Sequence, residues 1–126
     1  DVNNCSKCRC PSGWTGDFCN QRPAGTMLLS ATASNQILPI EMGEGDDMKG
    51  TDGITMQIRY WLIQAPAGRR VVVFPRFYGI WYSNSCNIMG VDLKFMNDQR
   101  HAGLQICNYN VNYTPVVSEG NNIFVT

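Results

Sequence analysis

Apolar and polar residues alternate along much of the chain, in short segments separated by turn-forming residues. Between residues 54 and 63, for example, apolar side chains occupy every second position. A period of two is typical of half-buried β-strands, and no segment shows the period of an amphipathic helix with capping residues. Strands are therefore predicted at 26–33, 36–40, 54–65, 70–77, 91–96, 102–107, 114–117 and 122–125. Many short strands with turns between them indicate an all-β sandwich.

The same pattern assigns faces to several side chains. In the segment 54–63 the even-numbered set is expected to face the core: Ile54, Met56, Ile58, Tyr60 and Leu62. The run 71–74 is apolar at every position, which predicts a central strand covered on both sides. Further along, Val91, Leu93 and Phe95 are expected to share one face.

The first 22 residues are rich in cysteine, glycine and proline instead. Between Cys10 and Cys19, Trp14 and Phe18 are the only large apolar side chains, too few to build a core. A Cys10–Cys19 disulfide would stabilise such a loop by about 2–3 kcal/mol, because it restricts the unfolded chain. A metal site is the alternative for a C-x-x-C-x-C cluster, but structural zinc usually takes its four ligands from two paired motifs, and the sequence has no second C-x-x-C and no histidine besides His101. We therefore expect disulfides and a secreted, extracellular protein.

Charge and hydropathy exclude some functions. Ten basic and ten acidic residues among 126 give a formal net charge of zero. Arg69-Arg70 is the only basic doublet, so the basic stripe of a nucleic-acid-binding protein is missing. No apolar run reaches the length of a membrane span, and nothing in the pattern sets an oligomeric state. The polar start at Asp1 does not resemble a signal peptide, so a secreted chain with this start would be a mature or excised piece.

Two groups of residues are candidates for ligand binding. Glu41, Glu44, Asp46 and Asp47 lie among glycines and could hold a weak calcium ion, although their spacing is not that of an EF-hand and a solvated loop is the favoured interpretation. An aromatic cluster begins at Phe74. Its candidate binding residues are Arg76, Phe77, Tyr78, Trp81 and Tyr82, since tyrosine, tryptophan and arginine are enriched at interface hot spots. Packing in the core and along a loop is the competing, somewhat favoured interpretation.

No catalytic constellation is apparent in the sequence. His101 lies in the segment 98–103, which is typical of a hairpin turn, so a solvated histidine is expected rather than a catalytic base. Glycosylation sequons occur at Asn4 and Asn112. The cysteine inside the first sequon and Pro115 after the second are expected to reduce their use.

Two stretches resemble known extracellular modules. The segment C-R-C-P-S-G-W-T-G-D-F-C, which begins at Cys8, resembles the second half of an EGF-like module. The chain from about Gly25 resembles a CUB domain, through Y-W-L-I-Q-A-P-A-G at 60–68, G-V-D-L-K at 90–94 and the pair Cys86 and Cys107. The order of the modules is similar to the C-terminal region of nematode astacin-type zinc metalloproteases. The resemblance implies a partial EGF-like module at 1–22 and a CUB-like antiparallel β-sandwich of jelly-roll type at 23–126.

The resemblance also implies roles for the cysteines. Cys86 and Cys107 match a disulfide that closes a hairpin-like link in CUB domains, and Cys10 and Cys19 match the last EGF-like pair. Cys5 and Cys8 match the third and fourth EGF-like cysteines, whose partners would precede Asp1. They could instead pair with each other or remain unpaired.

This chain departs from the family pattern at three places. Arg59 stands just before Tyr60, where many CUB domains have a cysteine. The segment 88–90 lacks the acidic residue that many CUB domains use for calcium, so no calcium site of that type is expected. The chain also ends soon after 121–123, where the family has further strands, so the domain could be truncated at its C-terminus.

Two functions remain open at this stage. The first is a non-catalytic accessory region of a secreted astacin-like metalloprotease, which makes contact with an extracellular protein or the matrix. Zinc and peptide hydrolysis would then belong to a catalytic domain outside this chain, and no cofactor is expected within it. The second is a stand-alone secreted EGF–CUB protein that binds a host or matrix ligand.

Overall fold

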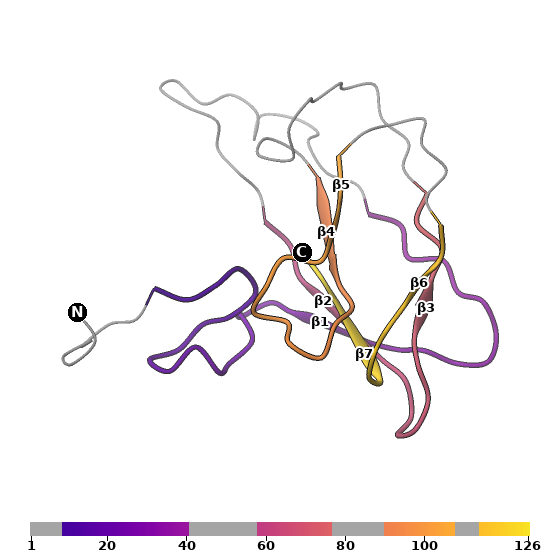
Figure 1. Cartoon of the computed structure of the whole chain (residues 1–126), viewed down its shortest axis with the longest axis horizontal. Coiled ribbons are helices and arrows are strands. Elements are labelled where there is room, and N and C mark those ends of the chain that lie inside the picture. The colour runs from indigo at the N-terminus through magenta and orange to yellow at the C-terminus, as the bar shows by residue number, and fades with distance from the viewer. Residues whose placement is uncertain (1–8, 41–57, 77–89, 108–113) are drawn as a thin grey trace.

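The described residues of the computed structural model are 9–40, 58–76, 90–107 and 114–126, and they form an all-β fold (Figure 1). Its seven strands are β1 (Met27–Ser30), β2 (Trp61–Gln64), β3 (Val72–Val73), β4 (Val91–Lys94), β5 (Leu104–Ile106), β6 (Val116–Val117) and β7 (Asn122–Val125). Each lies within a segment that the alternation predicts as a strand. The prediction of an all-β sandwich is confirmed.

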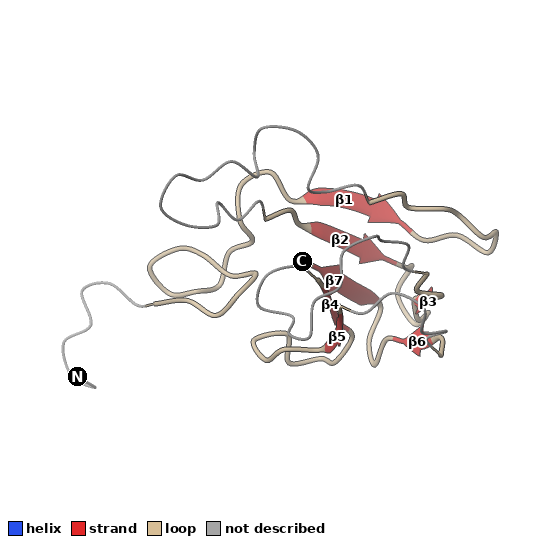
Figure 2. Cartoon of the chain, turned by 90° about the horizontal axis from the view of Figure 1, so that it is seen from above, coloured by secondary structure: helices blue, strands red, loops and turns tan. Residues whose placement is uncertain are grey.

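The strands form one five-stranded sheet and one two-stranded sheet. The large sheet has the order β1-β2-β7-β4-β5, and β3 pairs with β6 beside it (Figure 2). The pairs β2–β7, β7–β4, β4–β5 and β3–β6 are antiparallel. β1 departs from the expected antiparallel arrangement, because it runs parallel to β2 with Met27 opposite Trp61.

The core lies between the two sheets. Trp61, Leu93, Ile106, Ile123 and Val125 from the large sheet pack in one cluster with Val71 and Val116, which belong to the segments that carry the small sheet. β7 is the central strand, and Ile123, Phe124 and Val125 are each at most 2% exposed. Because neighbouring residues of a strand point to opposite faces, Ile123 and Val125 enter this core while Phe124 points to the other side of the sheet.

The face expected for the segment 54–63 is wrong in its described part. Trp61 is buried and Ile63 packs against the core, whereas Ile58 is 56% exposed. The strand begins only at Trp61, so Ile58 lies outside it and does not follow the alternation of faces that holds for Leu62. The residues 54–57, with Ile54 and Met56, lie outside the described residues.

The apolar run 71–74 is not a central strand. Val71 is buried, but Val72 and Phe74 are 48% and 60% exposed. The two-stranded sheet has only one covered face, since only that face contacts the large sheet. Apolar content alone could not distinguish this strand from β7, which is covered on both sides.

The predicted strand at 36–40 is also wrong. Its side chains alternate, with Leu38 and Ile40 packed against the core and Ile37 exposed. The segment nevertheless belongs to no sheet. Pro39 has no N–H to donate to a ladder, which is consistent with an irregular backbone. The expected shared face of Val91, Leu93 and Phe95 is confirmed, because all three contact the core cluster.

Candidate functional site

The N-terminal loop, which we define as residues 9–22, is closed by a disulfide between Cys10 and Cys19, as the sequence predicts. The backbone of Thr15 and Gln21 forms an antiparallel bridge across the base of the loop. Gly13 and Gly16 have φ angles of 86° and 90°, which residues with a side chain rarely adopt. Phe18 is 85% exposed at the tip of the loop, so the loop presents an aromatic ring to solvent.

Arg22 fastens the N-terminal loop to the sheet. Its guanidinium lies 3.8 Å from the centre of the Trp14 ring and 4.1 Å from the centre of the Phe124 ring. Tyr60 stacks on Phe124 at 5.9 Å. The cation therefore joins an aromatic ring of the loop to an aromatic ring of the central strand, on the face opposite the core. A cation–π contact stabilises by about 0.5–2 kcal/mol, more when it is desolvated.

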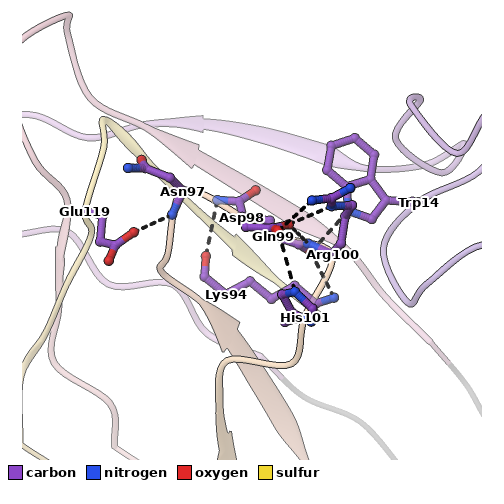
Figure 3. A network of polar contacts seen from close by, with 8 residues as sticks. All are labelled: Trp14, Lys94, Asn97, Asp98, Gln99, Arg100, His101 and Glu119. Atoms are coloured by element: carbon purple, nitrogen blue, oxygen red, sulfur yellow. Dashed lines mark hydrogen bonds and ion pairs between the residues drawn. The ribbon is translucent and has the colours of Figure 1, made fainter.

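Lys94 and Gln99 complete this junction with hydrogen bonds. Lys94 is 2% exposed, and its ammonium donates to the carbonyls of Ser12, at 2.5 Å, and Gln99, at 3.2 Å. The Trp14 indole N–H also donates to the Gln99 carbonyl, at 3.1 Å (Figure 3). The Gln99 side chain accepts from Arg22 and donates to Asn122. Burial lowers the pKa of Lys94, although the nearby Asp92 carboxylate partly offsets this effect.

The connection between β4 and β5 presents charged side chains beside the junction. Arg100 donates two hydrogen bonds to the Asp98 carboxylate, at 2.8 and 2.7 Å, and His101 lies 3.5 Å from the same carboxylate (Figure 3). The His101 side chain is 74% exposed, which confirms the expected solvated turn histidine. Glu119 accepts from the backbone N–H of Asn97 at 2.8 Å, which ties this connection to the end of β6.

Most candidate residues from the sequence fall outside the described residues. Of the expected binding residues, Arg76 is described and exposed. The remaining candidates for ligand binding, glycosylation and disulfide bonding lie outside the described residues. They are Phe77, Tyr78, Trp81, Tyr82, Glu41, Glu44, Asp46, Asp47, Asn4, Asn112, Cys5, Cys8 and Cys86. Cys107 is disulfide-bonded, as the CUB resemblance implies, but its expected partner Cys86 is among these residues.

The sequence did not single out Arg22, Lys94, Gln99 or Phe124. Arg22 and Gln99 are separated by 77 positions, so no local pattern relates them. Alternation places Lys94 on the polar face of β4. That face is buried because the N-terminal loop covers it. The described ranges contain no group of three or more His, Cys, Asp or Glu side chains that could hold a metal ion. They also contain no helix with the length and apolar character that crossing a bilayer requires.

We expect Arg22→Ala to lower the free energy of unfolding by about 2 kcal/mol, because two cation–π contacts and the bond to Gln99 are lost together. Urea unfolding followed by circular dichroism measures this change. Arg22→Lys is the matched control, since it keeps the charge without the flat guanidinium and should recover less than half of the loss. Full recovery in Arg22→Lys would show that charge alone, without stacking between the rings, holds the junction.

The pKa values of Asp92 and Asp98 should lie on opposite sides of 3.8, the ordinary pKa of an aspartate side chain. Hydrogen bonds from the Arg100 side chain and backbone hold the pKa of Asp98 below that value, and burial raises the pKa of Asp92 despite its bond from Gly103 N–H. Asp98 thus contributes stability that is lost as the pH falls through its lowered pKa. Asp92 contributes stability that is lost as the pH rises from 3.8 through its raised pKa. NMR titration of the carboxyl carbons tests this order, and Asp92 titrating first on acidification is the expected result.

Comparison with known proteins finds relatives among nematode zinc metalloproteinases. Zinc metalloproteinase nas-17 of Caenorhabditis elegans is 30% identical over 113 residues, which are 88% of this chain and 26% of that protein. Zinc metalloproteinase nas-25 of the same organism is 27% identical over 92% of this chain and 30% of its own length. For zinc metalloproteinase nas-20 the identity is 28%, over 97% of this chain and 32% of the relative. The chain thus spans about a third or less of these relatives. No family model and no solved structure matches it.

Proposed function

We propose that this chain is a non-catalytic accessory region of a secreted astacin-like zinc metalloproteinase, and that it binds an extracellular protein or a matrix component. The observation that carries the proposal is the pattern of the alignments. They span 88% to 97% of this chain but only 26% to 32% of three relatives whose names describe them as zinc metalloproteinases. A region of this length in a larger enzyme fits an appended module.

The histidine content also supports a non-catalytic role for this chain. The zinc motif of astacin-type enzymes, H-E-x-x-H with a further histidine, needs at least three histidines, whereas this sequence contains His101 alone. Zinc binding and peptide hydrolysis in the parent enzyme would therefore come from residues outside this chain. Within the proposal, residues 1–22 are a partial EGF-like module and residues 23–126 a CUB-like domain. The junction around Arg22 supports this arrangement, because it would hold the two modules in a fixed relation.

A two-substrate comparison tests the proposal. The full-length enzyme and a form that lacks residues 1–126 are assayed on a short quenched fluorescent peptide and on an insoluble extracellular matrix extract. Because an accessory region acts by raising the local concentration of substrate, its loss should lower turnover of the matrix about tenfold or more. Peptide cleavage should be unchanged. An equal loss on both substrates, or no loss on either, would contradict the proposal, and replacement of the H-E-x-x-H glutamate controls for contaminating proteases.

A further inference from the structure

The segment 70–76, which contains β3, and the neighbouring strand β6 share an exposed face with an apolar centre and a basic residue at each end. Exposure alternates along 70–76, where Arg70, Val72, Phe74 and Arg76 are exposed and Val71 is buried. Val117, 46% exposed, lies directly opposite Val72 on the neighbouring strand β6. We call Arg70, Val72, Phe74, Arg76 and Val117 the arginine-flanked face. Contiguous apolar exposure with a polar rim is typical of an interaction site.

The two arginines on this face are not neutralised within the described part of the chain. The ion pairs described there join Asp98 with Arg100 and His101, and neither Arg70 nor Arg76 takes part. Glu119, the acidic residue that follows β6, already accepts from the Asn97 N–H. Six residue steps of extended chain place the Cα atoms of the two arginines about 20 Å apart at most. Within the described residues, a partner would therefore meet an apolar stripe bounded by two cations that have no ion pair there.

We infer that the arginine-flanked face binds an extended protein segment whose central side chains are apolar and whose flanking side chains are carboxylates. This inference rests on the proposed binding function and names the class of partner. An arginine fork matches a carboxylate in two parallel hydrogen bonds, and such pairs gain strength where a neighbouring apolar contact excludes water. Val72, Phe74 and Val117 supply that contact. The charge of the face selects an acidic segment, and its apolar centre selects one with hydrophobic residues.

Two other classes of partner fit the face less well. A sulfated polysaccharide satisfies the arginines but offers no apolar groups to cover Phe74 and the valines. An anionic membrane would require side chains that protrude into the acyl region. About half of the Val72 and Val117 side chains is instead already covered, and Phe74 is the one large apolar side chain of the face that is mostly exposed, at 60%. A short apolar stripe of this kind suits the side chains of an extended peptide.

Selection from a displayed library of random ten-residue peptides tests the inference. Immobilised chain is used as bait, and fluorescence anisotropy then measures the affinity of the enriched peptides. We expect enrichment of Asp or Glu on both sides of apolar residues. The double variant Arg70→Gln/Arg76→Gln should bind these peptides about tenfold more weakly or worse, as expected for the loss of hot-spot arginines. Arg69→Gln is the matched control, because Arg69 is an adjacent exposed arginine outside the alternation, and it should leave binding unchanged.

Several results would overturn the inference. These are the absence of enriched peptides, enriched peptides without carboxylates, and equal binding by the double variant. Heparin and phosphatidylserine vesicles serve as further probes, and binding to either that the double variant loses would assign the face to that class instead. Unchanged thermal midpoints show that the exposed substitutions leave the fold intact. If the peptide selection fails while the two-substrate assay gives the expected result, the binding role of this face is rejected and the accessory function is retained. If the selection succeeds while the two-substrate assay fails, the face is retained and the accessory function is rejected.

Discussion

Gly103→Ala is expected to lower the free energy of unfolding by at least about 3 kcal/mol, the largest effect among the substitutions considered. A Cβ atom at position 103 would lie 1.9 Å from the carbonyl oxygen of Leu93 and 2.8 Å from the Cα of Lys94. Both are backbone atoms, so no side-chain rotation can relieve the clash. β4 and β5 would have to separate where Leu93, 3% exposed, enters the core. Urea unfolding measures the change.

Ala102→Ser is the control for Gly103→Ala. Ala102 is exposed and adjacent in the same connection, so its substitution should change stability by no more than about 0.5 kcal/mol. A second readout is the hydrogen bond from Gly103 N–H to Asp92, 2.8 Å long, whose amide should lose protection from hydrogen exchange when the strands separate. If Gly103→Ala unfolds at the same urea concentration as the unaltered chain, the close approach of β5 to β4 is wrong.

Gly13→Ala is expected to cost about 2–4 kcal/mol, because strain and overlap add at this position. The φ angle of Gly13 is 86°, and an added Cβ would lie 2.6 Å from Cε1 of Phe124. The Phe124 ring contacts Arg22 and stacks on Tyr60, so it has little room to move away. The substitution should therefore lift the N-terminal loop off the sheet. Thermal unfolding and the NMR shift of the Trp14 indole N–H report the two effects separately.

Gly25→Ala separates strain from overlap. Gly25 has nearly the same φ angle, 81°, but no atom lies within 4 Å of the position that a Cβ would occupy. Gly25→Ala should therefore cost only the conformational part, about 1–2 kcal/mol. Equal losses for Gly13→Ala and Gly25→Ala would contradict the docking of the loop against Phe124.

The alternation of apolar residues was sufficient to locate every strand of the described residues but not to arrange them. β7 is the last strand in the sequence, yet it lies between β2 and β4 and forms the centre of the sheet. Pairing at this distance along the chain leaves no local signal, so the run 71–74 looked more central than Asn122–Val125. The segment 36–40 shows that alternation alone does not establish a strand, since its side chains alternate in burial but its backbone joins no sheet.

The candidate sites were predictable only in part. Cysteine spacing located the Cys10–Cys19 loop, and the hairpin pattern placed His101 in solvent. The buried Lys94 could not be inferred, because the Ser12 carbonyl that accepts from its ammonium lies 82 positions away in the sequence. The arginine-flanked face did leave a signal in the sequence. Arg70, Val72, Phe74 and Arg76 occupy alternate positions, which on a strand with one covered face places two cations around an apolar centre.

The intact mass of the native protein that contains this sequence, measured before and after reduction, tests the account most directly. If the chain is an appended region of a longer enzyme, the product will exceed the 14.1 kDa of these residues several-fold. It will also gain about 2 Da for each disulfide reduced, those of Cys10 and Cys107 included. A native protein of 14.1 kDa, with no catalytic domain attached, would contradict the account.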